Sequence, residues 1–288
     1  GELISDLRSH AFTGLSRKED NWTFSQTSQW FPHQQAMLYA SVSTGSKGGG
    51  FDEAYSGPGR TIRLGNRLTG EPTGEVVAGA DPSVLEYEDE KVLAYEIGSK
   101  LTLLDGAAEL NVAVFRMEYD NLQVSSLVGD TFRVGNAGES TSEGVEVDGR
   151  WQLTRRFSLG GSLAYLHARY DDFEGATCTV LQSTDPLNHP GCLREDGSNI
   201  ETAGENGGQD LSGRRLTFAP DWSANLNATY THPVGDRMRL IASTDINYSD
   251  SFYSALDLDP VTKHDSYTQI NARIALASVG DIWSIALI

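Results

Sequence analysis

The sequence lacks any long apolar run. None of its 288 residues belongs to a stretch of the roughly 18 consecutive apolar residues that a transmembrane helix requires. Hydrophobic residues make up only 39% of the chain. A helical membrane protein is therefore excluded. A membrane β-barrel is not, because only every second residue of a barrel strand faces lipid and the others face a polar lumen.

Basic residues are also scarce. The chain has 22 Lys and Arg against 40 Asp and Glu, a formal net charge of −18. Such a chain would be repelled by the phosphates of a nucleic acid, so we expect no nucleic-acid partner. The acidic excess is concentrated in two segments. Residues 48–90 hold nine acidic and three basic side chains, and residues 171–213 hold nine acidic and one basic.

These acidic segments have two interpretations. Most acidic runs are solvated surface, and this is the simpler explanation. The alternative is a divalent-cation site or contact with cation-bridged surface sugars. Calcium could be held by hard carboxylate oxygens, although neither candidate cluster has the full spacing of a known calcium loop. The candidates are Asp171, Asp172 and Glu174 in one segment and Asp257 and Asp259 in another.

Cysteine is nearly absent. The two cysteines, Cys178 and Cys192, lie in the same acidic segment, which predicts a local disulfide in an oxidising compartment. His189 is close in sequence, but two Cys and one His do not form a recognised ligand spacing, so we expect no metal site here. The chain also lacks a Gly-x-Ser-x-Gly elbow and any nucleophile–base arrangement. We therefore predict that the protein is not an enzyme and holds no cofactor.

The N-terminus lacks the marks of a translation start. Residues 1–6 include neither an initiator Met nor the basic and apolar regions of a signal peptide. We therefore expect the chain to be an internal piece of a longer protein.

The most informative feature that is present is the alternation of short turns with long connections. Period-two patterns predict ten strands, near residues 20–30, 36–46, 91–103, 107–119, 142–153, 157–170, 215–230, 237–249, 265–277 and 282–288. Tight turns are expected at 31–34, 103–106, 153–156, 233–236 and 279–281, whereas the other connections are long, at 48–90, 121–140, 171–213 and 251–264. Tight turns at one end and long loops at the other are typical of an outer-membrane β-barrel.

The strand from residue 145 to 153 illustrates the two faces. Its apolar members, Val145, Val147, Trp151 and Leu153, are predicted to lie on the outer, convex face, and its polar members, Glu146, Asp148, Arg150 and Gln152, on the inner, concave face. Aromatic residues cluster near strand ends, as membrane interfaces favour. A soluble β-sandwich also alternates, and it remains the alternative fold.

Several ordered motifs resemble those of TonB-dependent outer-membrane receptors. They are MLYASVSTGSKGGGF at 37–51, YEIGSK at 95–100, NAGE at 136–139 followed by SEGVEVD at 142–148, FAPDW at 218–222, and YTQINARI at 267–274. Each motif is weak alone, but their order and spacing match the C-terminal half of that family from about residue 20 to the end of the chain.

The resemblance implies an all-β fold, an antiparallel up-and-down transmembrane β-barrel. In that family the barrel has 22 strands and encloses a plug domain, and residues 1–288 would supply about ten strands as one partial barrel domain. The plug, its TonB-contacting segment and the terminal strand would be absent from this chain. The implied location is the outer membrane of a Gram-negative bacterium. The implied partners are outer-membrane lipid, the TonB complex by way of the missing plug region, and a small-molecule ligand such as a metal chelate.

The resemblance also suggests a function and a candidate site. The implied function is active uptake of a scarce ligand such as a ferric siderophore, energised by TonB. The loop residues best suited to an aromatic, anionic ligand are Phe51, Tyr55, Arg60, Arg63 and Arg67, although ordinary loop packing is the simpler explanation for each of them. The alternative functions are a passive porin-like barrel and a soluble β-sandwich binding module.

Overall fold

The fold is dominated by one ten-stranded antiparallel sheet. The computed structural model describes residues 15–52, 86–128, 131–194, 197–200 and 207–288. The sheet contains β1 (Ser25–His33), β2 (Ala36–Lys47), β5 (Glu90–Leu103), β6 (Ala108–Asp120), β9 (Glu139–Thr154), β10 (Phe157–Asp172), β13 (Trp222–Val234), β14 (Met238–Ser249), β17 (Tyr267–Ser278) and β18 (Ser284–Leu287). All ten predicted strands are thereby confirmed.

Each strand of the sheet pairs with its neighbour in sequence. The order is β1-β2-β5-β6-β9-β10-β13-β14-β17-β18, and every pairing is antiparallel. This is the up-and-down order that the sequence predicts. Within the described ranges β1 and β18 do not pair with each other, so the sheet has two open edges.

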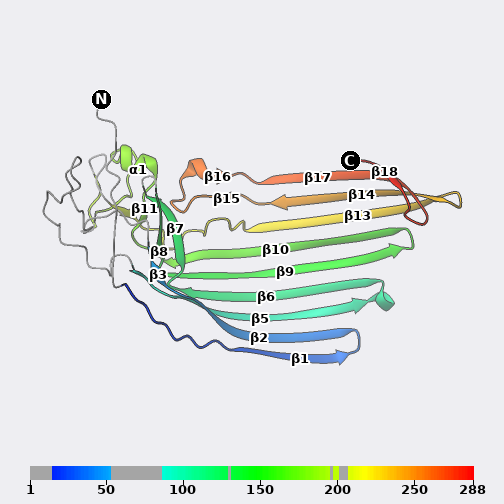
Figure 1. Ribbon diagram of the computed structural model, residues 1–288, viewed down its shortest axis with the longest axis horizontal. Helices are drawn as coiled ribbons and strands as arrows, with labels where there is room; N and C mark the ends of the chain where they lie inside the picture. The colour runs from blue at the N-terminus through cyan, green and yellow to red at the C-terminus, as the bar shows by residue number, and fades with distance from the viewer. Residues whose placement is uncertain (1–14, 53–85, 129–130, 195–196, 201–206) are drawn as a thin grey trace, which may run out of the picture.

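Tight turns and long loops lie at opposite ends of the sheet, as predicted (Figure 1). The turn between β5 and β6 is a short 3-10 segment, η2 (Leu104–Gly106). Leu104, Asp105 and Gly106 all have positive φ values, of 53°, 54° and 90°. Asp tolerates this left-handed conformation and glycine adopts it without cost, which explains why an Asp-Gly pair occurs here.

The long connections contain structure that the sequence analysis did not anticipate. Four small two-stranded sheets form at this end: β3 (Gly50–Phe51) with β4 (Glu86–Tyr87), β7 (Gln123–Val128) with β8 (Thr131–Asn136), β11 (Ala176–Thr177) with β12 (Gly208–Gln209), and β15 (Phe252–Tyr253) with β16 (Lys263–His264). A helix α1 (Val180–Thr184) and a 3-10 segment η3 (Pro260–Thr262) are also present. Three of these sheets have strands of two residues, which are too short for a period-two pattern to reveal, whereas β7 and β8 have six residues each.

Two strands begin five or more residues later than predicted. The strand expected at 215–230 begins at Trp222, and the one expected at 20–30 begins at Ser25. In the first case Pro220 has no N–H for the ladder and Phe218 has a φ of 55°, so the ladder starts only beyond them. Before that point, the backbone of Arg215 forms an isolated bridge with Arg169.

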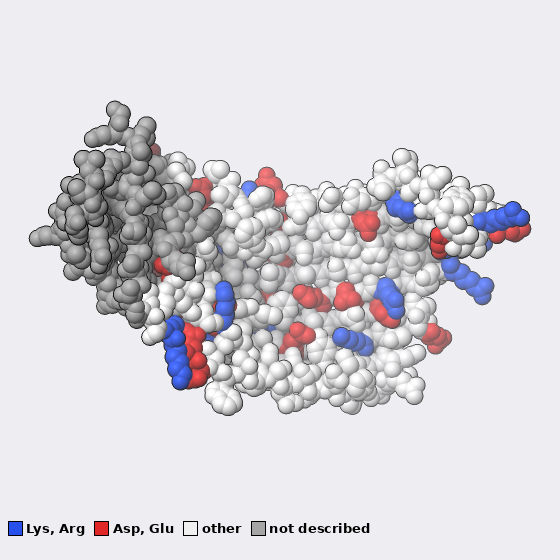
Figure 2. Space-filling view, viewed as in Figure 1, with Lys and Arg blue, Asp and Glu red and all other residues white. Residues whose placement is uncertain are grey.

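The two faces of the sheet differ sharply in polarity. Opposed residues share a face, so the register Lys100↔Asn111↔Asp148 places these three polar side chains together. The register Val112↔Val147↔Leu163 does the same for apolar side chains on the opposite face. Figure 2 shows the polar face, with acidic and basic side chains over the middle strands.

The apolar face is exposed. Val145 and Trp151 are 37% and 46% exposed, and Val147 and Leu153 are half-buried. In the described part of the chain the other sheets have two strands each, so no second sheet covers this face as it would in a β-sandwich. Which face is concave stays a prediction. No helix among the described residues is long and apolar enough to cross a membrane.

Candidate functional site

The predicted ligand residues fall mostly outside the described ranges. Phe51 is half-buried in β3, where it is opposed by Glu86 of β4. Tyr55, Arg60, Arg63 and Arg67 lie in residues 53–85, outside the described residues. Their role therefore stays a prediction. Phe51 lies beside the long loops at one end of the sheet (Figure 1).

The loops at this end share a small hydrophobic core of their own. Its buried members come from four separate segments and are Ala137, Tyr170, Phe173, Ala176, Leu211 and Leu258. The rings of Tyr170 and Phe173 meet with centroids 4.9 Å apart. Because the buried members of this core come from four segments and pack against one another, the loops form a packed cap over the strand ends. No local sequence pattern indicates this core, since its members come from segments that are far apart in the chain.

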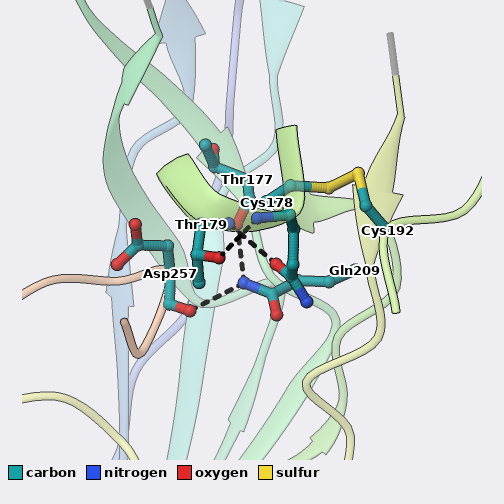
Figure 3. The surroundings of a disulfide bond; sticks show 7 residues. Thr177, Cys178, Thr179, Cys192, Gln209 and Asp257 are labelled. Carbon is teal, nitrogen blue, oxygen red and sulfur yellow. Dashed lines mark hydrogen bonds between the residues drawn. A yellow bond between two sulfur atoms is a disulfide. The ribbon is translucent and has the colours of Figure 1, made fainter. Parts of the chain in front are cut away.

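The disulfide lies within this cap. Cys178 and Cys192 are bonded, with Cα atoms 5.7 Å apart, and Ile200 packs against both. The prediction of the disulfide is confirmed. Figure 3 shows how Gln209 ties the same region to another loop. Its Nε2 donates to the carbonyl oxygens of Thr177 and Asp257, at 2.7 Å in each case.

Removing the disulfide is expected to loosen this loop without weakening the sheet. In the chain-entropy model, a closed segment of about 15 residues contributes roughly 3 kcal/mol. In the Cys178→Ser/Cys192→Ser variant, limited proteolysis is expected to cut within residues 173–221 at least ten times faster, with an unchanged temperature of barrel unfolding. A clearly lower temperature of barrel unfolding in this variant would show that the disulfide stabilises the sheet as well as the loop.

A second set of contacts anchors the start of the chain to the first long loop. Arg17 donates from Nη1 to Glu86 at 2.5 Å and from Nη2 to Glu88 at 3.1 Å, and its Nε also contacts Glu19. Glu19 in turn accepts from the backbone N–H of Gly49 at 3.0 Å. The hydrogen bonds to Glu19 and Glu88 raise the pKa of the Arg17 guanidinium above its already high value. Arg17 therefore stays charged and holds together the two edges of the loop that carries the predicted ligand residues.

Over strands β2, β5, β6 and β9, the polar face of the sheet carries charged side chains that contact a neighbouring charge or a tyrosine. Arg150 makes a two-pronged contact with Glu109, with its Nε at 2.8 Å and its Nη2 at 2.5 Å from the two carboxylate oxygens. Tyr39 donates to Glu96 at 2.5 Å, and its ring lies where a side chain at position 98 would be, which requires the glycine found there. This half of the wall is therefore charged, and Arg150 is held in an ion pair with Glu109.

The other half of the polar face is lined with amides. Asn225 donates to Asn247 at 2.7 Å, and Asn227 donates to Asn225 at 3.3 Å. Asn271 and Gln269 continue the same rows on β17. The sequence analysis missed this array, although alternating Asn in residues 225–227 was its available signal. The row from Asn227 to Asn271 passes through Asp245, so this part of the wall offers amide donors and acceptors together with a carboxylate.

The candidate calcium residues are engaged in turns. Asp257 accepts from the backbone N–H of Asp259, and Asp259 accepts from that of Val261. The side-chain and backbone hydrogen bonds of Ser212 lower the pKa of nearby Asp210 in the same cap. Among the described residues, no three His, Cys, Asp or Glu side chains are grouped as metal ligands would be.

Comparison with known families gives a match over nearly the whole chain. The model described as "TonB dependent receptor-like, beta-barrel" matches residues 5–287. Among curated proteins, the chain is 25% identical over 154 residues to the probable TonB-dependent siderophore receptor PiuA of Acinetobacter baumannii. It is 33% identical over 93 residues to the metal-pseudopaline receptor CntO of Pseudomonas aeruginosa.

Solved structures share the fold. The ferric yersiniabactin uptake receptor FyuA of Yersinia pestis matches 87% of this chain with a TM-score of 0.54 and 15% identity. PiuA of A. baumannii matches 92% with a TM-score of 0.54 and 18% identity. The chain spans only part of these proteins: 29% of FyuA and 30% of PiuA as structures, and 54% of this chain matches 18% of PiuA as a sequence.

Proposed function

The chain belongs to the TonB-dependent receptor β-barrel family, and from this membership we propose that it forms part of a receptor that actively imports a scarce small-molecule ligand such as a ferric siderophore. The protein is located in the outer membrane of a Gram-negative bacterium. The family consists of transport receptors that bind small molecules and interact with TonB, and we expect no enzymatic activity.

The observation that carries the proposal is the family match over 283 residues, from 5 to 287, together with a sheet that is polar on one face and apolar on the other. An apolar outer wall suits lipid and a polar inner wall suits a wet lumen. The names of the relatives add a ligand class: PiuA is described as a probable siderophore receptor and CntO as a receptor for metal-pseudopaline. Both ligands are metal chelates.

We propose further that residues 1–288 supply ten consecutive strands of a larger barrel, and that the remaining strands and a plug belong to the same receptor. The two open edges at β1 and β18 support this arrangement, since a stable barrel must close. The ligand would be captured at the loop end, with Phe51, Tyr55, Arg60, Arg63 and Arg67 as its contacts in this chain.

The test is uptake of radioactive iron by cells that express the complete receptor. The cells receive ferric chelates of the catecholate, hydroxamate and carboxylate classes, with and without a functional TonB. Uptake of at least one chelate that disappears without TonB supports the proposal. Uptake that does not depend on TonB would support a passive porin-like barrel instead, and no uptake of any class would contradict a role in iron import.

The predicted ligand residues lead to a specific expectation. Arg60→Ala/Arg63→Ala/Arg67→Ala is expected to raise the concentration for half-maximal uptake at least ten-fold, because hydrogen bonds from a cation to an anionic ligand contribute about 1.5–3 kcal/mol each. The maximal rate should change little. Arg194→Ala, in a different loop, serves as the matched control. An unchanged affinity in the triple variant would remove these arginines from the site.

A further inference from the structure

The two ends of the first long loop are held by side chains from other segments. The loop leaves β2 through Gly48 and returns to β5 through Glu88, and between these points β3 and β4 pair over two residues each. A two-stranded pairing this short is marginal in water. The position of the two loop ends therefore depends on contacts from elsewhere in the chain.

Asn136, the last residue of β8, holds the returning end by its backbone. Its Oδ1 accepts from the backbone N–H of Glu88 at 2.7 Å, and its Nδ2 donates to the carbonyl oxygen of Glu88 at 3.1 Å. Nδ2 also donates to the carbonyl oxygen of Asn121 at 2.7 Å. A side-chain amide has an acceptor oxygen and two donor hydrogens, and all are used here. Asn136 thus pairs with Glu88 as a residue of a neighbouring strand would.

Gln123, the first residue of β7, joins the outgoing end to the returning end. Its Nε2 donates to the carbonyl oxygen of Gly48 at 2.9 Å and to that of Glu88 at 3.1 Å. Its backbone N–H donates to a carboxylate oxygen of Glu90 at 2.8 Å. Gln123 lies directly opposite Asn136 in the β7–β8 register, and β8 lies against β4 at the loop end of the sheet (Figure 1). The two amides, Gln123 and Asn136, form one amide clasp on both loop ends.

The amide clasp is itself fixed by the packed cap. Leu122, the residue before Gln123, packs against the core of the cap, and Ala137, the residue after Asn136, is fully buried in it. The N–H of Ala137 donates to the carbonyl oxygen of Leu122 at 2.7 Å, which closes the base of the β7–β8 hairpin. A close-packed core resists such shifts, so the clasp holds the first long loop at a set position relative to the disulfide-bonded loop.

Close packing at the outgoing end restricts the loop further. A Cβ at Gly50 would lie 2.5 Å from the hydroxyl oxygen of Tyr87. A Cβ at Gly49 would collide with the carbonyl oxygen of Tyr87 and lie 2.8 Å from the guanidinium carbon of Arg17. Atoms in a packed interior do not approach this closely, so glycine is required at both positions. The glycine run at 48–50 is thus explained by packing at the base of the loop.

We propose that the amide clasp of Gln123 and Asn136 positions the first long loop for ligand capture, and so sets the affinity of the receptor for its metal chelate. This role rests on the proposed function, because the ligand contacts predicted for this chain, Phe51 among them, lie on that loop. Gln123 and Asn136 are positioning residues that act through the loop. A loop already held in place loses less conformational freedom when the ligand binds, so a loosened loop binds more weakly.

The test replaces the clasp amides by residues that keep or lose their donors. Both side-chain bonds of Gln123 are donated, so Gln123→Glu, which has only acceptors, should raise the ferric chelate concentration for half-maximal uptake about ten-fold at an unchanged maximal rate. Gln123→Lys can still donate to both carbonyl oxygens and should stay within about two-fold of the unmodified receptor. Asn136→Asp keeps the acceptor but loses both donors, and should behave as Gln123→Glu does. The probes are the catecholate, hydroxamate and carboxylate ferric chelates of the uptake assay.

Hydrogen exchange of the complete, folded receptor measures the loop ends without any ligand. Amides 86–90 should exchange about ten-fold faster in Gln123→Glu and Asn136→Asp, whereas the amides of β13 and β14 should exchange as in the unmodified receptor. Asn188→Asp is the matched control, because Asn188 is an exposed cap amide whose side chain donates to Asp185 within its own turn. It should change neither affinity nor exchange. Heat-modifiability on gels confirms that each variant is folded.

The outcomes separate this role from the proposed function. If the unmodified receptor imports no chelate, the proposed function fails, and this role fails with it. If the unmodified receptor imports a chelate and both Gln123→Glu and Asn136→Asp keep its affinity, only the positioning role is overturned. Equal losses of affinity in Gln123→Lys and Gln123→Glu, or a loss in Asn188→Asp as large as in Asn136→Asp, would also overturn it, since neither could then be assigned to the donated bonds of the clasp.

Discussion

Expressed alone, residues 1–288 are expected to aggregate and to conduct no ions across a bilayer. The ten-stranded sheet leaves the outer edges of β1 and β18 unpaired within the described structure. Each unsatisfied backbone group costs several kcal/mol in hydrocarbon, so an open sheet cannot span a membrane stably. In water the exposed apolar face and the two open edges would favour association with other copies.

Two measurements check this expectation. Size-exclusion chromatography of the refolded chain should show large assemblies and no monomer, and planar-bilayer recordings should show no single-channel steps. The complete receptor, refolded in the same way, is the control and should run as a heat-modifiable monomer. Discrete conductance from residues 1–288 would mean that β1 and β18 close into a ten-stranded barrel.

The second large effect concerns a single arginine placed on either face of β10. Leu163 is 45% exposed on the apolar face, opposed by Val147 and Ala224. If this face contacts lipid, Leu163→Arg near the middle of the band should lower the free energy of unfolding by about 2–4 kcal/mol. In a soluble protein the same exposed position would tolerate arginine to within about 0.5 kcal/mol.

The neighbouring residue provides the matched control. Ser162 is exposed on the polar face, opposed by Asp148 and Asn225. Ser162→Arg should change stability by less than about 1 kcal/mol, because a wet lumen solvates the charge and Asp148 lies opposite it. Urea unfolding of both variants of the complete receptor in lipid vesicles measures the difference. Equal stability of the two variants would contradict the assignment of the faces.

The strands and turns could be predicted because each depends on residues close together in the chain. The alternation from Val145 to Leu153 places successive side chains on opposite faces whatever the rest of the protein does. Asp105-Gly106 similarly specifies its own turn. The cysteine pair was also predictable, since 14 positions separate its members.

The candidate site was harder to predict. Phe51 is the one predicted ligand residue that falls in the described part of the chain, and its neighbours at 53–85 are outside it. The amide rows of Asn225, Asn247 and Gln269 come from three strands and become neighbours only through their register. Single-strand patterns mark each as inward but do not show that they form one surface.

The sequence by itself determined which residues form strands, the order of those strands and the face on which each side chain lies, because period two is a property of an extended chain with one wet and one apolar side. Only the tertiary structure decided which loops pack together and where the apolar face is hollowed. Tyr170, Leu211 and Leu258 meet in one core, and Tyr95 and Tyr165 flank one groove, although long stretches of chain separate them. Such contacts depend on register across several strands and on side-chain size at distant positions, which no local pattern encodes.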